Sequence, residues 1–282
     1  MAIVISTINL KGGVGKTTTT VGLAEMLTSE FGKKVLLVDL DPQTNATTML
    51  IGEHKWKELN DEEYTLARLF KDALEPENSR FNLEKSLQRN VSNITVVENL
   101  DLIPSSIDLI NIQDDLAKMP AGQFYANNPV EILKKAIRPI MDNYDYILID
   151  CPPNMGIITL NGLRIADGYI IPTIPDVLST YGIPQIIQRV NAFSNDIGKE
   201  IKVLGIVIAK YRDNSNLHRN TLARLKREVD APVFNAIFKE TNQMANAADY
   251  TVSYSTYRRK WGYGDQYDAF YRLAKEIQER FV

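Results

Sequence analysis

A glycine-rich turn that contains two lysines follows an apolar segment close to the start of the chain. Residues 3–5 read I-V-I, and residues 11–18 read K-G-G-V-G-K-T-T. Glycines let backbone N–H groups close around phosphate oxygens, and the N-terminus of a following helix adds partial positive charge. In such a turn Lys16 can reach the β- and γ-phosphates of a nucleotide, and the Thr17 hydroxyl can hold Mg²⁺. The predicted phosphate-binding residues are Lys11, Gly12, Gly13, Val14, Gly15, Lys16, Thr17 and Thr18.

The turn departs from the usual phosphate-binding pattern, G-x-x-x-x-G-K-[ST], at its first position. Leu10 stands where the first glycine belongs, and a second lysine, Lys11, precedes the glycine pair. The alternative interpretation is a glycine-rich turn that binds nothing. A chance match to this string directly after a strand is rare, so we favour phosphate binding.

Carboxylates follow two further apolar runs. Asp39 and Asp41 come at the end of a branched-aliphatic run at residues 34–38, and Asp150 ends a run at residues 146–149. Because the carboxyl ends of parallel strands meet at one edge of a sheet, we expect these acids near the phosphate-binding turn. Carboxylates there suit the handling of Mg²⁺ and water, and an Asp at the end of an apolar strand is the Walker B arrangement. A plain strand-end turn is the alternative for the D-L-D-P segment, since Asp-Pro often starts a turn.

The composition excludes several classes of protein. The 282 residues, 44% of them hydrophobic, can bury one large core, and the net charge of -3 means that contact with nucleic acid would need a local basic patch. The lone cysteine, Cys151, excludes an intramolecular disulfide and a cysteine metal cage built within one chain. We interpret it as a buried spacer, because neither His54 nor His218 is placed to activate it. No secretion signal or membrane-spanning run is present, so we expect a cytoplasmic protein.

Strands alternate with helices along the chain, which predicts an α/β fold with a mostly parallel, twisted sheet and helices on both faces. Besides the N-terminal strand, we expect strands at residues 34–39, 100–103, 146–149, 168–171 and 203–208. We expect helices at residues 21–31, 129–142, 159–166, 184–195, 217–228 and 266–281. One domain, residues 1–282, accounts for this alternation.

Residues 52–93 interrupt the alternation of strands and helices. Residues 52–77 hold eight acids and four bases. We interpret the stretch as a solvated, partly helical, acidic insertion in the same domain. A separate binding module is the alternative, although nothing in the stretch carries chemistry.

The K-G-G-V-G-K-T-T string resembles the deviant Walker A P-loop of the ParA/MinD ATPases. The segments D-L-D-P-Q-T-N at residues 39–45 and D-C-P-P at residues 150–153 are similar to the switch I and switch II motifs of these proteins. The resemblance runs from residue 2 to about residue 210, and by it the chain is identified as a member of the ParA family of partition and positioning ATPases. It implies a P-loop NTPase fold, ATP and Mg²⁺ as cofactors, and slow ATP hydrolysis that a partner and DNA stimulate.

The resemblance also implies roles for individual residues. In an ATP-bound homodimer Lys11 would contact the phosphates of the partner subunit, while Lys16 contacts those of its own subunit. Asp41 would position the attacking water and touch the metal shell, and Asp39 would support the metal site. The catalytic residues implied are Lys11, Lys16 and Asp41, and the metal-site residues are Thr17, Asp39, Asp41 and Asp150.

The chain departs from the family in the two segments that normally frame the adenine. A-K-Y-R at residues 209–212 and F-K-E-T at residues 238–241 replace the family's sequences there. Recognition of the base is therefore the property that the resemblance predicts least well. From these two segments we assign only Lys210 to the nucleotide site. The P-loop also begins too early to leave room for the N-terminal helix-turn-helix domain of larger members, so we expect no operator binding.

Basic residues gather in two later segments. Residues 202–227 hold seven Lys or Arg and one acid, and residues 257–261 read Y-R-R-K-W. Such patches bind the DNA backbone without reading its sequence, and the resemblance implies non-specific binding to double-stranded nucleoid DNA by the ATP dimer. A solvated helix face is the alternative interpretation. The predicted DNA contacts are Arg219, Arg224, Lys226, Arg227, Arg258, Arg259 and Lys260.

The predicted function is thus segregation or positioning of a cargo through an adaptor protein, either ParB-like or organelle-associated. The cargo could be a plasmid, a chromosome region or a protein organelle such as a carboxysome, and the protein would be associated with the nucleoid. One alternative is a MinD-like membrane-associated ATPase, but residues 267–282 mix acids and bases and indicate a packing helix, so we expect no membrane contact. Another is a bacterial tyrosine-kinase-like enzyme, because six tyrosines lie between residues 250 and 271; Lys11 and simple aromatic packing argue against it.

Overall fold

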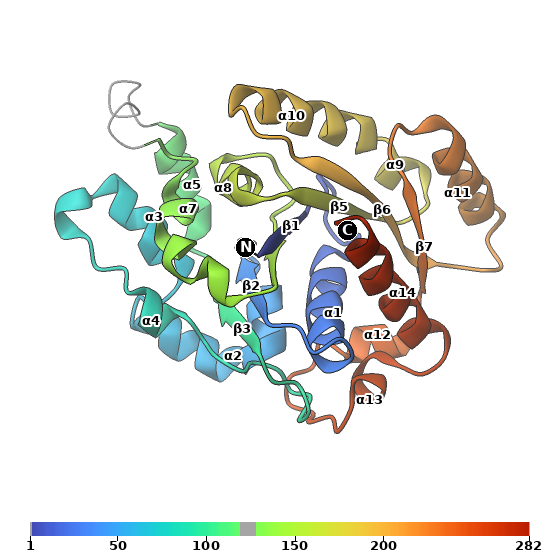
Figure 1. The fold of residues 1–282 in the computed structure, drawn as a ribbon, viewed down its shortest axis with the longest axis horizontal. Helices are drawn as coiled ribbons and strands as arrows, with labels where there is room; N and C mark the ends of the chain where they lie inside the picture. Colours follow the sequence, from blue (N-terminus) through green and yellow to red (C-terminus); the bar gives the residue numbers. More distant parts are fainter. Residues whose placement is uncertain (1, 119–127, 282) are drawn as a thin grey trace.

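The computed structural model describes residues 2–118 and 128–281. Its centre is a seven-stranded sheet in the order β3-β2-β4-β1-β5-β6-β7, in which every neighbouring pair is parallel (Figure 1). The strands are β1 (Ile3–Thr7), β2 (Val35–Asp39), β3 (Leu100–Ile103), β4 (Tyr146–Asp150), β5 (Gly168–Thr173), β6 (Lys202–Tyr211) and β7 (Val233–Lys239). The predicted parallel α/β fold is confirmed, and β7 is a strand that the sequence analysis missed.

Helices cover both faces of this sheet (Figure 1). One face packs against α3 (Leu66–Leu74), α5 (Leu109–Ala117), α7 (Ile132–Ile137), α8 (Ile157–Ile165), α10 (Ile183–Asp196) and α11 (Asn216–Glu228). The other face packs against α1 (Lys16–Ser29), α2 (Asn45–Asp61), α13 (Tyr257–Trp261) and α14 (Asp265–Glu279). Shorter elements are α4 (Leu83–Ser86), α9 (Val177–Thr180), α12 (Asn242–Asn246) and the 3-10 turns Pro76–Asn78 and Arg138–Asn143.

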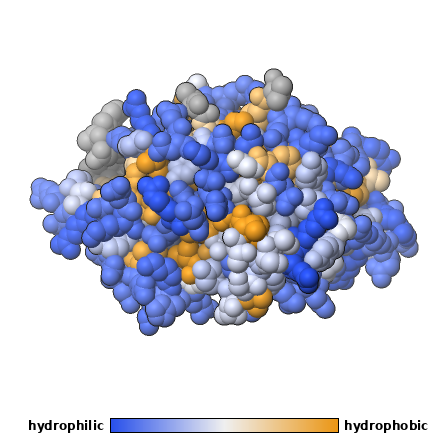
Figure 2. All heavy atoms as spheres, turned by 60° about the horizontal axis from the view of Figure 1, so that its bottom comes forward, coloured by the Kyte–Doolittle hydropathy of each residue, from blue (hydrophilic) through white to orange (hydrophobic). Residues whose placement is uncertain are grey.

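The central strands read as unbroken apolar runs because both of their faces are covered. All residues of β2 are buried, and they alternate between the two layers: Leu36 and Val38 point to one, Val35 and Leu37 to the other. The face of the molecule shown in Figure 2 is in contrast mostly hydrophilic, with separate apolar patches.

Two predicted helices have outcomes that bear on function. The helix expected at residues 129–142 is wrong as a single element: α7 ends at Ile137, and the chain continues as a 3-10 turn with Pro139 in its first positions. The C-terminal helix α14 buries Phe270, Leu273 and Ile277 against the sheet, as expected for a packing helix. Among the described residues, no helix combines the length and the apolarity needed to cross a membrane.

The acidic stretch at residues 52–93 contributes side chains to both apolar layers. Leu59 belongs to the layer around α1, and Phe70 belongs to the layer on the opposite face. Gly52, at φ 77° and ψ 162°, kinks α2 where the stretch begins. This packing favours the prediction of one domain over a separate module.

Candidate functional site

The glycine-rich turn joins the end of β1 to the start of α1 at the carboxyl edge of the sheet. Gly13 and Gly15 have φ values of 75° and 89°, which side chains with a Cβ rarely adopt. A Cβ on Gly15 would also lie 3.3 Å from Cβ of Ala209 in β6. Lys16 is buried, and its Nζ donates to the carbonyl oxygen of Lys11 at 3.4 Å. The backbone of the turn therefore forms a tight cradle, and the Lys16 side chain lies inside it.

The Thr17 hydroxyl and the Asp150 carboxylate meet directly beneath this turn. Thr17 Oγ1 donates to Asp150 Oδ2 at 2.6 Å, and strand register places Asp150 beside both Thr7 and Asp39. Burial raises the pKa of Asp150 to about 7; the charge of Asp41 adds to the shift, while the Thr17 hydrogen bond opposes it. The Thr17 hydroxyl and the Asp150 carboxylate are hard oxygen ligands of the kind that Mg²⁺ prefers. A bound cation would also relieve the repulsion between the carboxylates of Asp150 and Asp41.

Asp39 holds the switch I segment rather than facing open space. Its Oδ1 accepts from the Asp41 amide at 3.1 Å, and its Oδ2 accepts from the Thr47 amide at 2.9 Å and the Thr47 hydroxyl at 2.7 Å. The side chain is fully buried, which together with the charge of Asp150 raises its pKa. Any support that Asp39 gives to a metal site is therefore indirect, through the position of Asp41.

Asp41 lies close to the other candidate catalytic groups. Burial raises its pKa, a hydrogen bond from the Gln43 amide opposes the shift, and so does the positive charge of Lys16. The Ser105 hydroxyl donates to the Asp41 carbonyl oxygen at 2.8 Å. Ser105 follows β3, and the sequence analysis assigned it no role.

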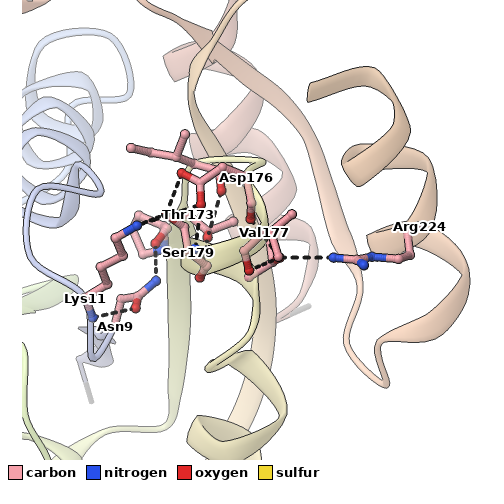
Figure 3. A network of polar contacts seen from close by, with 10 residues as sticks. Asn9, Lys11, Thr173, Asp176, Val177, Ser179 and Arg224 are labelled. Atoms are coloured by element: carbon pink, nitrogen blue, oxygen red, sulfur yellow. Dashed lines mark hydrogen bonds and ion pairs between the residues drawn. The ribbon is translucent and has the colours of Figure 1, made fainter. Parts of the chain in front are cut away.

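Lys11 turns away from the glycine-rich turn and contacts the connection after β5. Its Nζ donates to Ser179 Oγ at 2.9 Å and lies 3.7 Å from Asp176 Oδ1 (Figure 3). Asp176 caps α9 by accepting from the Ser179 amide at 2.6 Å. The Lys11 amide donates to Asn9 Oδ1, and Asn9 Nδ2 donates to the Pro172 carbonyl oxygen. The sequence analysis missed Asn9, Asp176 and Ser179; only the D-x-x-S capping pattern marks the last two.

A cavity of about 290 Å³ opens beside the glycine-rich turn. Gly15, Thr18 and Lys210 line this cavity, and Lys210 has a left-handed φ of 51°. Glu240 and Met244 belong to the F-K-E-T segment and to α12, respectively. The remaining lining residues are Thr19, Ala209, Phe238, Lys239, Thr241, Ala245 and Ala248. A flat, partly apolar ring system held by the turn would fit here, and the α12 residues that line the cavity were not predicted from the sequence.

The predicted DNA contacts fall into two separate groups. Arg219, Arg224, Lys226 and Arg227 are exposed on α11, whereas Arg258 and Arg259 are exposed on α13, in another part of the molecule (Figure 1). The prediction for Lys260 is wrong. Its side chain is fully buried, and its Nζ lies 2.7 Å from Glu25 Oε1 inside the apolar layer.

Two tyrosines of the C-terminal cluster and Cys151 make contacts inside the protein. Tyr257 is buried and donates to the Gly22 carbonyl oxygen at 3.0 Å, and Tyr267 donates to Glu30 at 2.6 Å. Cys151 is fully buried, and burial raises the pKa of its thiol. These contacts favour a packing role for Tyr257 and Tyr267, whereas Tyr250, Tyr263 and Tyr271 are exposed. For Cys151 they favour a buried spacer over a reactive thiol.

Comparisons with known proteins identify relatives in both sequence and structure. A family model described as an AAA domain matches residues 2–203. The chain is 31% identical to the chromosome-partitioning ATPase Soj of Treponema pallidum over 275 residues, which are 97% of this chain and 96% of that protein. It is similar to the structure of cobyrinic acid a,c-diamide synthase from Mycobacterium smegmatis with a bound ATP analogue and magnesium (25% identity, TM-score 0.75, 100% of this chain and 96% of that chain). The fold also matches apo McdA from Cyanothece (22% identity, TM-score 0.78, 98% and 100%).

Proposed function

The chain belongs to the ParA family of P-loop ATPases, and from this membership we propose that ATP joins two copies of it into a dimer that binds DNA. It is a partition or positioning ATPase with ATP and Mg²⁺ as cofactors. An adaptor protein, ParB-like or organelle-associated, would stimulate the slow hydrolysis and connect the dimer to its cargo. The name of the T. pallidum relative makes a chromosome region the first cargo to test.

The position of Lys11 is the observation that carries the proposed dimer. Lys16 already occupies the cradle that would bind the phosphates of the same subunit. The Lys11 amine lies outside the cradle, and its side chain is 40% exposed. A second lysine beside a site that already has one is useful if it reaches phosphates bound by another copy, where a charge-assisted contact stabilises the dimer only while ATP is present.

The remaining residues would divide the work of hydrolysis. Thr17 and Asp150 would hold Mg²⁺, which when bound neutralises charge on the phosphates. Asp41 would orient the attacking water, because its carboxylate is near Lys16 and accepts from the Gln43 amide, while Asp39 holds the Asp41 backbone amide. The catalytic gain would come from positioning and electrostatics rather than from covalent chemistry.

The cavity beside the glycine-rich turn is the proposed site of the adenine. Its walls continue directly from Gly15 and Thr18, so a base attached to phosphates in the cradle would enter it. Met244 supplies an apolar surface for stacking, and Lys210 and Glu240 supply polar groups at the rim. Lys210 and Glu240 lie in the two segments where the chain departs from the family, and Met244 follows the second of them.

DNA binding and the nucleoid location rest on the exposed arginines of α11 and α13. In a dimer each group occurs twice, so a duplex would meet about twice as many cations as on a monomer. The overall charge of -3 restricts such binding to these surfaces. We expect no dependence on base sequence, because backbone contacts do not read it.

The Lys11→Ala variant tests the proposed dimer. We expect nucleotide affinity to stay within about tenfold of wild type, because Lys16 keeps its contacts, while ATP-dependent dimerisation and hydrolysis are abolished. Light scattering with ATP and with ADP measures dimerisation, and phosphate release measures hydrolysis. Lys34→Ala, an exposed lysine before β2, is the matched control. An unaltered ATP-dependent dimer in Lys11→Ala would remove the role of Lys11 in the second copy's site.

A further inference from the structure

A closed ring of hydrogen bonds joins four buried residues near the carboxyl ends of β2 and β3: Asp39, Asp41, Thr47 and Ser105. The Asp41 amide donates to Asp39 Oδ1 at 3.1 Å, and the Thr47 hydroxyl donates to Asp39 Oδ2 at 2.7 Å. The Ser105 amide donates to Thr47 Oγ1 at 3.0 Å, and the Ser105 hydroxyl donates to the Asp41 carbonyl oxygen at 2.8 Å. The ring therefore holds the backbone of Asp41 at both its amide and its carbonyl group.

Three elements bring the residues of this ring together. β3 runs beside β2 with Ile103 opposite Val38, so the residues that follow the two strands are neighbours. Thr47 lies in the first turn of α2. Further along α2, Trp56 Nε1 donates to the Ser105 carbonyl oxygen at 3.1 Å. Ser105 is thus held by α2 through its own backbone, and its hydroxyl is free to hold Asp41.

The Ser105 hydroxyl does more than satisfy a buried carbonyl group. The Thr44 amide already donates to the Asp41 carbonyl oxygen at 2.9 Å, so the hydroxyl is a second donor to the same oxygen. Thr44 has a left-handed φ of 55°, which is unusual for a β-branched residue. Such a conformation persists only where the surroundings fix it, and it is common in functional segments. The second hydrogen bond therefore restricts residues 41–44 to one conformation.

The direction of the Asp41 carboxylate depends on this conformation. Asp41 Oδ1 accepts from the Gln43 amide at 3.0 Å, within the same turn, so a change in the backbone there turns the carboxylate as well. A displacement of about 1 Å at a group that orients a reactant can lower a rate about 100-fold. A hydroxyl that fixes the turn can therefore control hydrolysis from outside the nucleotide site.

We propose that Ser105 is a positioning residue for ATP hydrolysis. Its hydroxyl fixes the backbone of Asp41, and the ring as a whole aims the Asp41 carboxylate at the attacking water. The inference rests on the proposed function, because it takes Asp41 as the group that orients this water. Thr47 has a related part, since its hydroxyl joins Ser105 to Asp39.

The variant Ser105→Ala tests this role. It opens the ring, but the Thr44 amide still donates to the Asp41 carbonyl oxygen, so the fold and the phosphate cradle remain. We expect kcat for ATP hydrolysis to fall about tenfold while KM for ATP stays within about twofold. Ser106→Ala is the matched control, because Ser106 is equally buried and its hydroxyl donates to Asn60 Oδ1 at 2.7 Å, outside the ring. Steady-state phosphate release measures both constants.

Variants of Thr47 open the same ring from its other side. Thr47→Val removes the hydroxyl at nearly constant volume, and we expect it to reproduce the fall in kcat. Thr47→Ser keeps the hydroxyl and should restore most of the rate. A double-mutant cycle then separates positioning from general support of the site: in an Asp41→Ala background, Ser105→Ala should change the residual single-turnover rate by less than about twofold.

Each outcome of these measurements supports or overturns the inference. A fall in kcat that is specific to the ring and disappears in the Asp41→Ala background supports it. The same fall in both backgrounds, or an equal fall in Ser106→Ala, overturns it, because Ser105 then supports the protein independently of Asp41. If Ser105→Ala keeps the wild-type kcat while Asp41→Ala is inactive, the inference is overturned and the proposed role of Asp41 stands. Wild-type hydrolysis in Asp41→Ala removes that role, and this inference with it.

Discussion

The residues of the site differ in how far local sequence reveals them. Lys16, Thr17 and Asp150 were predicted because each stands at a fixed place in a short pattern of strand, glycine-rich turn or acid. The contact between Lys11 and Ser179 joins residues 168 positions apart, and that between Ser105 and Asp41 joins residues 64 apart. Such partners depend on strand order, which no local pattern contains.

Asp41→Ala isolates the role of a single carboxylate. The cradle and Asp150 remain, so we expect ATP and Mg²⁺ to bind and hydrolysis to fall at least about 100-fold, which traps the ATP-bound dimer. Phosphate release with and without the adaptor measures the fall in rate, and light scattering follows the dimer. Asp61→Ala, at the exposed end of α2, is the control. Hydrolysis at the wild-type rate in the Asp41 variant would show that another group positions the water.

At the scale of elements, burial on both faces is the property that sequence reports best. β2 and β4 are continuous apolar runs and were predicted closely. β7 lies at the edge of the sheet, and its burial alternates along V-F-N-A-I-F-K, which hid it from a search for unbroken runs. Lys260 was misassigned because Y-R-R-K-W has the composition of a surface patch, while its partner Glu25 lies 235 residues away.

Helix α13 is fastened to the P-loop helix α1 by this buried pair. Glu25 accepts from Lys260 Nζ at 2.7 Å and from Trp261 Nε1 at 2.6 Å, and the Ser92 hydroxyl also donates to it. Tyr257 adds its hydrogen bond to the backbone of α1. The exposed arginines of α13 are therefore held at a fixed position relative to the nucleotide site.

Removal of one partner of the buried Glu25–Lys260 ion pair leaves an uncompensated charge in the core. We expect Lys260→Met to lower the free energy of unfolding by about 3–5 kcal/mol, and Glu25→Gln/Lys260→Met to restore most of that stability, because glutamine still accepts from Trp261. Urea unfolding followed by circular dichroism measures both. Lys275→Met, an exposed lysine of α14, is the control. A change of less than about 1 kcal/mol in Lys260→Met would mean that Glu25 is stabilised without the lysine.

On the scale of the whole molecule, the nucleotide groups all lie at one edge of the sheet. β1 stands between β4 and β5, where the strand order reverses, and loops that leave neighbouring strands in opposite directions open a site there. The candidate DNA groups lie on α13 and on α11, whose Arg224 also contacts Thr180 of α9 (Figure 1). An ATP-bound dimer that used the edge for its partner could still present the arginines of α13 to a duplex.

Paired arginine substitutions determine which group binds DNA. We expect Arg224→Ala/Arg227→Ala and Arg258→Ala/Arg259→Ala each to weaken binding for every duplex sequence while the ATP-dependent dimer persists. If both residues of a pair neutralise phosphates, the slope of log K against log salt becomes shallower by about 0.9 for each phosphate that the variant leaves without its arginine. Fluorescence anisotropy across a salt series measures the slope.

Arg80→Ala/Arg89→Ala removes two exposed arginines that belong to neither group and serves as the control for this titration. A group that binds the DNA backbone changes both the affinity and the salt slope, whereas a group that acts only through folding changes the affinity and leaves the slope of the remaining protein unaltered. If both test pairs retain the wild-type slope, the DNA surface lies elsewhere. A strong preference for one duplex sequence would replace backbone binding by base recognition, which the exposed arginines alone do not provide.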